Sequence, residues 1–190
     1  MKYKLLNTAV SVIDNKNGSI ELIAPAKTDF FCDICSNYKV LNAPFYHTNI
    51  EIDFIFRCKV EPDFHEIYDA GGIIAYDSEN KWIKFAYEKT DLGYPSIVSV
   101  ITMDISDDCN GESINENEIW MQIVRSKNNW CLHYSKDKVS WKMVRYFRLD
   151  LSSRISIGIF SQSPRGNGCK VNFSDIELLK QTYNNIRKAE

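Results

Sequence analysis

The chain has 190 residues, 44% of them hydrophobic, and a formal net charge of −2 at pH 7. A chain of this length can bury a sizeable apolar core, and its weak, mixed charge argues against nucleic acid or an anionic membrane as a partner. The apolar stretches near the N-terminus are too short for the core of a signal peptide or for a membrane span. We therefore expect a cytoplasmic protein with one domain over residues 1–180 and a short tail over 181–190.

Apolar and polar residues alternate along several segments, and a period of two is typical of β-strands with one buried face. In residues 51–58 the alternation places Ile52 and Phe54 on one face and Glu51 and Asp53 on the other. Further strands are predicted at 82–88, 119–125, 130–135, 154–162 and 170–179. The apolar sets are expected to face the core, with Phe54, Phe85, Ile123 and Ile157 pointing inward.

Turn-forming residues stand between the predicted strands, for example in 127–129 and 164–168. Many short strands at regular spacing predict an all-β fold, a sandwich of two antiparallel sheets. Two segments lack the alternation. The acidic segment 104–118 is predicted to be a long loop, and 178–190 is the best candidate for a helix, short and frayed.

The six cysteines include one C-x-x-C pair, Cys32 and Cys35. A structural zinc site needs four ligands. The sequence has no second such pair, and its three histidines do not have the spacing of zinc ligands. In a reducing compartment unpaired cysteines remain thiols, so we expect free thiols, no bound metal and no cofactor.

Several short stretches of the sequence, taken in order, resemble those of a known family. They include Tyr68-Asp69-Ala70-Gly71-Gly72-Ile73, residues 80–88, Tyr134-Ser135-Lys136-Asp137 and Ser163-Pro164-Arg165-Gly166-Asn167-Gly168. Over roughly residues 28–178 the series resembles the uncharacterised concanavalin A-like family that includes the fungal "regulation of enolase" proteins. It departs from the family at Ala70-Gly71, where Gln-Ala is usual, and at Lys138, where a turn glycine is usual. The resemblance implies a jelly roll of two curved sheets, as in legume lectins and β-glucanases, and implies no particular chemistry.

The segment 51–56 resembles part of the acidic strand of jelly-roll glucanases, in which alternate residues place three acids on one concave face. A retaining glycosidase needs two carboxyl groups about 5–5.5 Å apart. Glu51 and Asp53 have the required alternation, but Ile55 and Phe56 stand at the position of the third acid and the one before it. Apolar side chains cannot transfer a proton, so we predict no catalytic residue.

The polar faces of the predicted strands are the best candidates for a binding site. A tryptophan can stack on the apolar face of a pyranose, while carboxylates and amides take its hydroxyl groups. The predicted ligand-binding residues are Trp82, Lys84, Glu88, Trp120, Gln122, His133, Glu51 and Asp53, and the first five are expected to lie on the concave sheet. The alternative is that they cover a surface, or lie under the segment 104–118, with no ligand.

Three functions fit these observations. The first is a non-catalytic module that binds a carbohydrate, a small polyol or a protein partner on its concave sheet. The second is a divergent glycoside hydrolase that uses Glu51 or Glu88. The third, a regulatory protein that binds a metabolic enzyme, rests on the family name alone. The missing third acid favours the first.

Overall fold

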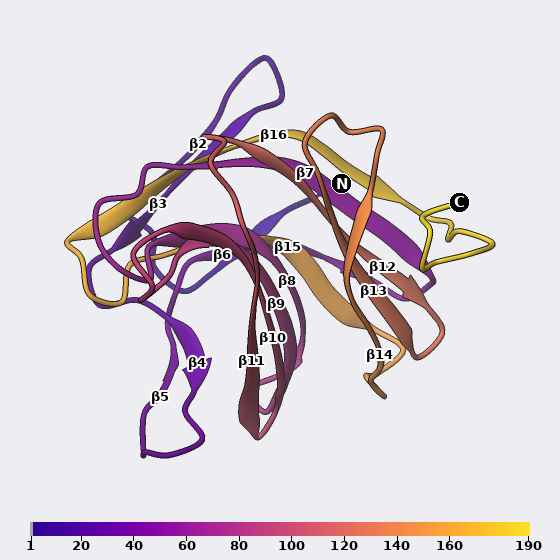
Figure 1. The fold of residues 1–190 in the computed structure, drawn as a ribbon, viewed down its shortest axis with the longest axis horizontal. Coiled ribbons are helices and arrows are strands. Elements are labelled where there is room, and N and C mark those ends of the chain that lie inside the picture. The colour runs from indigo at the N-terminus through magenta and orange to yellow at the C-terminus, as the bar shows by residue number, and fades with distance from the viewer. Residues whose placement is uncertain (1) are drawn as a thin grey trace.

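The computed structural model describes residues 2–190 and is built from β-strands, with no helix in that range (Figure 1). The strands are β1 (Lys4–Leu6), β2 (Ser11–Asp14), β3 (Ile20–Pro25), β4 (Phe30–Cys32), β5 (Lys39–Leu41), β6 (Phe45–Ile50), β7 (Phe54–Pro62), β8 (Ala70–Ser78), β9 (Lys81–Lys89), β10 (Pro95–Met103), β11 (Ile105–Ser113), β12 (Ile119–Ser126), β13 (Asn129–Ser135), β14 (Lys142–Arg148), β15 (Ile155–Gln162) and β16 (Gly168–Leu179). The prediction of an all-β fold is confirmed.

Two seven-stranded antiparallel sheets form a sandwich of the jelly-roll type. Sheet A has the strand order β1-β6-β15-β8-β9-β10-β11, and sheet B has the order β14-β13-β12-β7-β16-β3-β2. In Figure 1 strands β8 to β10 curve around the side on which the short β4–β5 hairpin lies, whereas sheet B covers their other side. The hairpin therefore occupies the concave face of sheet A.

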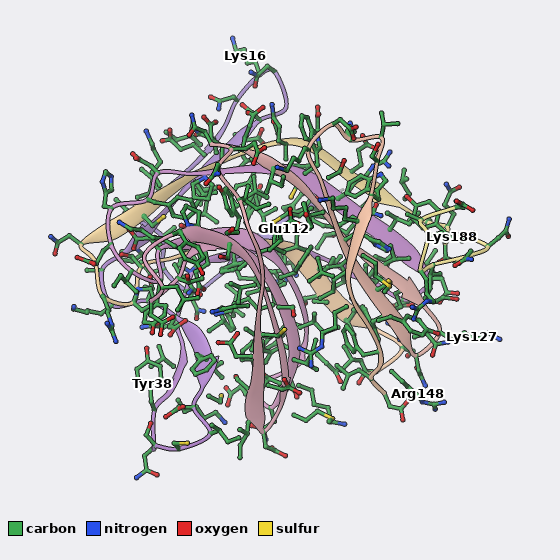
Figure 2. The ribbon with its side chains drawn as sticks, viewed as in Figure 1. Lys16, Tyr38, Glu112, Lys127, Arg148 and Lys188 are labelled. Carbon is green, nitrogen blue, oxygen red and sulfur yellow. The ribbon has the colours of Figure 1, made fainter. Side chains whose placement is uncertain are left out.

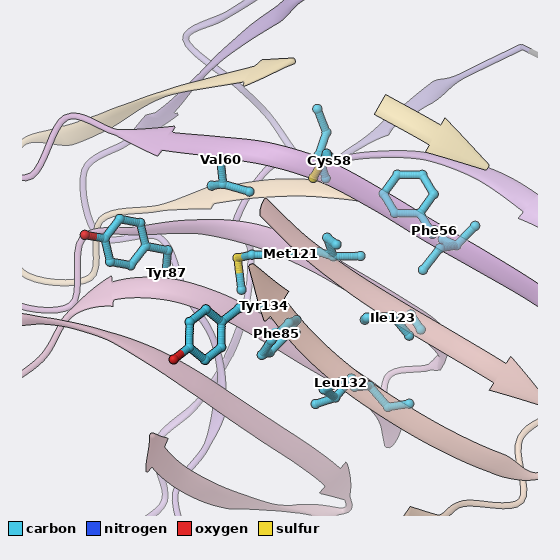
Figure 3. Close-up of a cluster of buried hydrophobic side chains, with 14 of the residues drawn as sticks. Phe56, Cys58, Val60, Phe85, Tyr87, Met121, Ile123, Leu132 and Tyr134 are labelled. Atoms are coloured by element: carbon cyan, nitrogen blue, oxygen red, sulfur yellow. The ribbon is translucent and has the colours of Figure 1, made fainter. Parts of the chain in front are cut away.

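Alternation along each strand decides which side chains fill the core. In β9, Phe85 and Tyr87 face sheet B and are fully buried, and the side chains on either side of them in the sequence face the hairpin. Met121 and Ile123 of β12 meet them from sheet B (Figure 3). The predicted inward-facing residues Phe54, Phe85, Ile123 and Ile157 all lie in this core.

Most charged side chains lie on the surface, and the few that are buried include Lys84 and Glu88. Figure 2 shows Lys16, Lys127 and Lys188 projecting from two turns and the C-terminal tail. Such placement keeps the ammonium groups hydrated. Within residues 2–190 no helix has the length and apolar character needed to cross a membrane.

A second apolar cluster lies on the concave face of sheet A, beneath the hairpin. Phe30 and Cys32 of β4 pack there against Trp82 of β9 and Phe160 of β15. The ring of Phe30 meets that of Trp82 edge to face, with centroids 5.7 Å apart. This contact covers what would otherwise be a wet sheet surface and fixes the hairpin over it.

Two predictions about local structure are wrong. The predicted loop 104–118 contains strand β11, which pairs with β10 from Met103↔Ile105 to Ser96↔Ser113. β11 is an edge strand with most of its side chains exposed, so it has no apolar face for a period-two pattern to reveal. The predicted helix in 178–190 does not form: β16 continues to Leu179, and the tail then lies without regular structure across sheet B.

The predicted strand 51–58 begins later than expected. β7 starts at Phe54, and residues 51–53 form the connection from β6. Ile52, expected to face the core beside Phe54, is instead exposed. The alternation continues into the connection by coincidence, because a residue outside the hydrogen-bonded ladder no longer shares the face of the strand.

Candidate ligand pocket

A cavity of about 400 Å³ lies between the β4–β5 hairpin and the concave face of sheet A. We call it the hairpin pocket. Its volume is within the range of small-molecule sites. Its lining comes from the hairpin region (Asp29, Phe31, Asp33, Ser36, Tyr38), from β9, β10 and β11 (Lys84, Glu88, Val98, Val100, Asp108) and from segments beside them (Tyr68, Gln162, Pro164, Arg165).

The floor of the hairpin pocket is apolar. Val98 and Val100 of β10 face the cavity, and Ala86 of β9 is the register partner of Val98. On β9, Lys84 and Glu88 stand on either side of Ala86 on the same face, with their Cα atoms about 13 Å apart from the strand rise. Lys84 and Glu88 thus lie next to a pocket floor of small aliphatic side chains.

Gln162 connects these two ionisable side chains. Lys84 Nζ donates to Gln162 Oε1 at 3.3 Å, and Gln162 Nε2 donates to Glu88 Oε2 at 3.5 Å and to the carbonyl oxygen of Tyr68 at 3.2 Å. All three side chains are almost completely buried: Lys84 is 2%, Glu88 6% and Gln162 1% exposed. Burying a charged group costs free energy unless the group is paired and hydrogen-bonded. The stability of the rest of the fold must therefore offset the cost of burying this network.

Asp29 ties the hairpin to the network. Its Oδ1 accepts the backbone N–H of Phe30 at 2.8 Å and lies 3.7 Å from Lys84 Nζ. Its Oδ2 accepts the hydroxyl of Tyr38 at 3.0 Å. Tyr38 lies on the hairpin in Figure 2. One carboxylate therefore joins the floor of the pocket to its roof.

Burial raises the pKa of Glu88 from its ordinary value of 4.5 to about 8. The positive charge of Lys84 opposes the increase, whereas the carboxylates of Asp108, Asp29 and Asp91 add to it. At neutral pH the Glu88 carboxyl group is therefore mostly protonated and can donate a hydrogen bond. The pKa of Asp108 is also raised, chiefly by partial desolvation, although its side chain stands at the open rim.

Two basic side chains of the pocket lie over aromatic rings, Arg165 at the entrance and Lys84 at the floor. The guanidinium of Arg165 lies 4.8 Å from the ring centroid of Tyr68, and Lys84 Nζ lies 5.7 Å from that of Phe31. Cations at this distance over an aromatic face are attracted by the ring quadrupole. The entrance therefore offers flat apolar surface next to hydrogen-bond donors.

The structure brings only part of the predicted site together. Lys84 and Glu88 line the hairpin pocket, and Trp82 lies on the same face of β9 but is fully buried beneath Phe30. Trp82 cannot stack on a ligand there. Its Nε1 has no hydrogen-bond partner among residues 2–190.

Trp120, Gln122 and His133 lie on sheet B, so the expectation that they share a surface with Lys84 is wrong. They are on its outer face, separated from the pocket by the whole core. Gln122 Nε2 and His133 Nδ1 are 3.3 Å apart, and Tyr183 of the tail donates its hydroxyl to Gln122 Oε1 at 3.3 Å. Burial lowers the pKa of His133 to about 4, so this histidine is a neutral, structurally packed residue at physiological pH.

Glu51 and Asp53 lie in the exposed connection before β7, away from the pocket. Glu51 Oε1 is 3.5 Å from Arg154 Nε, and Asp53 Oδ1 accepts the backbone N–H of Lys127 at 2.7 Å. Neither residue belongs to a strand, so the two carboxylates do not share a concave sheet face. Whether any of the eight predicted residues binds a ligand stays a prediction.

Most residues that line the pocket were not predicted from the sequence. Asp108 lies in a segment predicted to be a loop, and Arg165 and Tyr38 lie in turns. Gln162 had the clearest signal, because it ends the predicted strand 154–162 on the polar side of the alternation. No group of three or more His, Cys, Asp or Glu in residues 2–190 is arranged to hold a metal ion, and all six cysteines are free, with only Cys35 and Cys109 exposed.

Comparison with known proteins places this architecture in a family. The sequence profile described as "Protein of unknown function (DUF1349)" matches residues 5–181. The chain is 26% identical over 174 residues to "Regulation of enolase protein 1" of Saccharomyces cerevisiae, covering 91% of this chain and 87% of that protein.

Solved structures show the same fold. A functionally unknown protein from Saccharomyces cerevisiae superposes with a TM-score of 0.89 at 24% identity, covering 95% of this chain and 97% of that one. The carbohydrate-binding module CBM66 of Bacillus subtilis has a TM-score of 0.58 at 7% identity, covering 93% and 94%. The GH43 protein BlXynB of Bacillus licheniformis has a TM-score of 0.63 at 15% identity, and this chain covers only 33% of its length.

Proposed function

We propose that this chain, which belongs to the DUF1349 family of proteins of unknown function, is a binding module that takes a carbohydrate or another small polyol in the hairpin pocket. The observation that carries the proposal is the buried network of Lys84, Gln162 and Glu88, which faces a cavity of about 400 Å³ rather than the core. Such a network is costly to bury, and a role in binding would explain its position.

The chemistry of the pocket suits a hydroxylated ligand. An ammonium and a protonated carboxyl group donate hydrogen bonds, while the carboxylate of Asp29 and the amide oxygen of Gln162 accept them. A sugar hydroxyl can do both at once. The apolar floor of Val98 and Val100, opposite the ring of Phe31, offers surface for the C–H face of a sugar ring.

The fold comparisons support this reading only as an analogy of architecture. CBM66 is a carbohydrate-binding module of nearly the same length as this chain, so a jelly roll of this size can serve as a binding domain. Function lies in the site rather than in the fold.

Hydrolysis is the less favoured alternative. Glu51, one of its two predicted acids, is exposed and paired with Arg154. Glu88 has the raised pKa of a general acid, but its neighbour Asp29 is already engaged with Tyr38 and the Phe30 backbone N–H. We expect no turnover of chromogenic glycosides, and release of the chromophore that is lost in Glu88→Gln would favour an enzyme.

A protein partner is a second candidate, because the yeast relative is named for the regulation of enolase. This candidate rests on the name of the relative alone, which suggests a metabolic enzyme as the partner. Isothermal titration of the chain against purified enolase tests it directly. A measurable heat of binding, or a change in enolase turnover at saturating chain concentration, would support this role.

The main proposal is tested by a thermal-shift screen of monosaccharides and polyols. A ligand present at about 100 times its Kd should raise the free energy of unfolding by about 2.7 kcal/mol. Gln162→Ala, which removes the bridge between Lys84 and Glu88, should abolish the shift. Gln122→Ala serves as the control, because that buried glutamine lies on sheet B. Trp82→Ala is a poor choice, because removing a fully buried tryptophan costs about 3–5 kcal/mol by itself.

A shift that persists in Gln162→Ala would place the ligand elsewhere on the molecule. No shift with any sugar or polyol would contradict the proposal.

A further inference from the structure

The hairpin pocket contains more acidic than basic groups. Its lining includes the carboxyl groups of Asp29, Asp33, Glu88 and Asp108 and only two cations, Lys84 and Arg165. Lys84 is directed at Asp29 and Gln162, and the guanidinium of Arg165 lies over Tyr68. Within residues 2–190, Asp33, Glu88 and Asp108 form no ion pair with a basic side chain. Even with Glu88 protonated, the three other carboxyl groups of the lining outnumber its two cations.

Two of these carboxyl groups stand on different sides of the valine floor. Glu88 of β9 is the register partner of Ser96, and Asp108 of β11 is the register partner of Val100. Because β10 lies between β9 and β11, Val98 and Val100 lie between the two acids. Lys84 is the register partner of Val100 on β9, so the two acids lie diagonally across the floor, Glu88 nearer to Ser96 and Asp108 nearer to Val100.

Glu88 has unused hydrogen-bonding capacity although it is only 6% exposed. Its Oε2 accepts one long hydrogen bond, 3.5 Å from Gln162 Nε2. Its Oε1 accepts none from the described part of the chain. A buried carboxyl group that lines a cavity and has a free oxygen is a ready acceptor for a donor on a ligand.

We propose that the ligand of the hairpin pocket carries a protonated primary amine, as an amino sugar does, and that its ammonium group lies against the carboxyl group of Glu88, with Asp108 adding negative charge from the other side of the floor. This inference rests on the proposed function and narrows it to hydroxylated amines. An ammonium supplies the missing positive charge and three N–H donors. The hydroxyl groups of the same ligand then face Lys84 and Gln162.

Binding of such a ligand should release a proton. Free Glu88 is protonated at neutral pH because burial raises its pKa, and an adjacent ammonium favours the ionised form. The groups that act on Glu88 are Lys84 on its own strand, Asp108 on β11, Asp29 before β4, Asp91 after β9 and the amide of Gln162. Among these charged groups only Lys84 is positive, so an added cation changes the balance strongly. A neutral sugar brings no charge and should release no proton.

Isothermal titration calorimetry at pH 6.5 tests the inference with matched pairs of probes. D-glucosamine and D-galactosamine are compared with D-glucose, D-galactose and N-acetyl-D-glucosamine. We expect the two amines to bind at least about tenfold more tightly, as for a charge-assisted contact. Repeating the titration in two buffers of different ionisation enthalpy should show release of about one proton per amine bound.

Variants assign the effect to the two acids. Asp108→Asn should weaken amine binding about tenfold and leave neutral sugars unaffected, and Glu88→Gln should abolish the proton release. Asp107→Asn is the matched control, because Asp107 lies next in β11, pairs with Arg145 at 3.1 Å and does not line the pocket.

Each outcome decides between the two proposals. Neutral sugars that bind as tightly as their amines would overturn this inference and leave the proposed function standing. Amine binding that is unchanged in both Asp108→Asn and Glu88→Gln would also overturn it, because the amine would then lie elsewhere. If no sugar of either kind binds, the proposed function fails and the inference fails with it.

Discussion

The substitution Glu88→Gln should change how the stability of this protein depends on pH. An amide of the same shape can keep the contact with Gln162 but cannot ionise. The folded protein holds the Glu88 proton up to about pH 8, whereas the unfolded chain releases it near pH 4.5. Between these values the folded state binds more protons than the unfolded state, so wild-type stability must fall as the pH rises.

The magnitude follows from the raised pKa. A tenfold change in proton affinity is worth about 1.4 kcal/mol, so the increase from 4.5 to about 8 corresponds to about 5 kcal/mol. This contribution is fully present below pH 4.5 and is lost as the pH rises through about 8. Glu88→Gln lacks this contribution. Its free energy of unfolding, relative to that of the wild type, should therefore rise by roughly this amount between about pH 4.5 and pH 9.

Urea denaturation of both proteins at pH 5, 7 and 9 measures the difference. Other titrating groups contribute to both proteins and largely cancel in the comparison. Glu51→Gln is the control, because Glu51 is an exposed residue whose pairing with Arg154 contributes little to stability. Parallel pH profiles for wild type and Glu88→Gln would show that Glu88 is solvated and that the buried network described here is wrong.

Three further outcomes test the fold and its surfaces. Phe85→Ala should cost about 3–5 kcal/mol in a denaturant melt because Phe85 is fully buried, and a cost under about 1 kcal/mol would mean that the faces of β9 are reversed. A thiol titration without reductant should find two reactive groups in the native protein, Cys35 and Cys109, and six after unfolding; fewer than six would reveal disulfides. Removing residues 181–190 should cost about 1–3 kcal/mol because Tyr183 and Ile186 pack against Val124 and Cys131, and an unchanged melt would show that the tail is not docked.

Alternation in the sequence was enough to predict the strands that have one apolar face. β9, β12, β13 and β15 agree with their predicted ranges to within a residue at either end. The alternation did not predict β11, because both faces of this edge strand are largely exposed to solvent. The short strands of the β4–β5 hairpin, three residues each, are too brief to show any period, so the roof of the pocket was not predicted.

The candidate site was only partly predictable for a related reason. Alternation identifies the polar face of a strand but does not say to which sheet the strand belongs. Lys84 and Gln122 both lie on non-core faces, yet one belongs to sheet A and the other to sheet B. Each face is also covered by another segment, the hairpin on one side and the C-terminal tail on the other. Such contacts between residues far apart in sequence leave no local pattern.

Ligand binding in the hairpin pocket can be located by titrating the assigned ¹⁵N-labelled protein with the best sugar or polyol from the thermal-shift screen and mapping the chemical-shift changes. The largest amide shifts should cluster around the hairpin pocket, in residues 29–38, 84–88, 98–100 and 108. Residues 122 and 133, on the far side of the core, should not move. Shifts centred on the outer face of sheet B, or shifts spread evenly over the surface, would contradict the assignment of this pocket as the binding site.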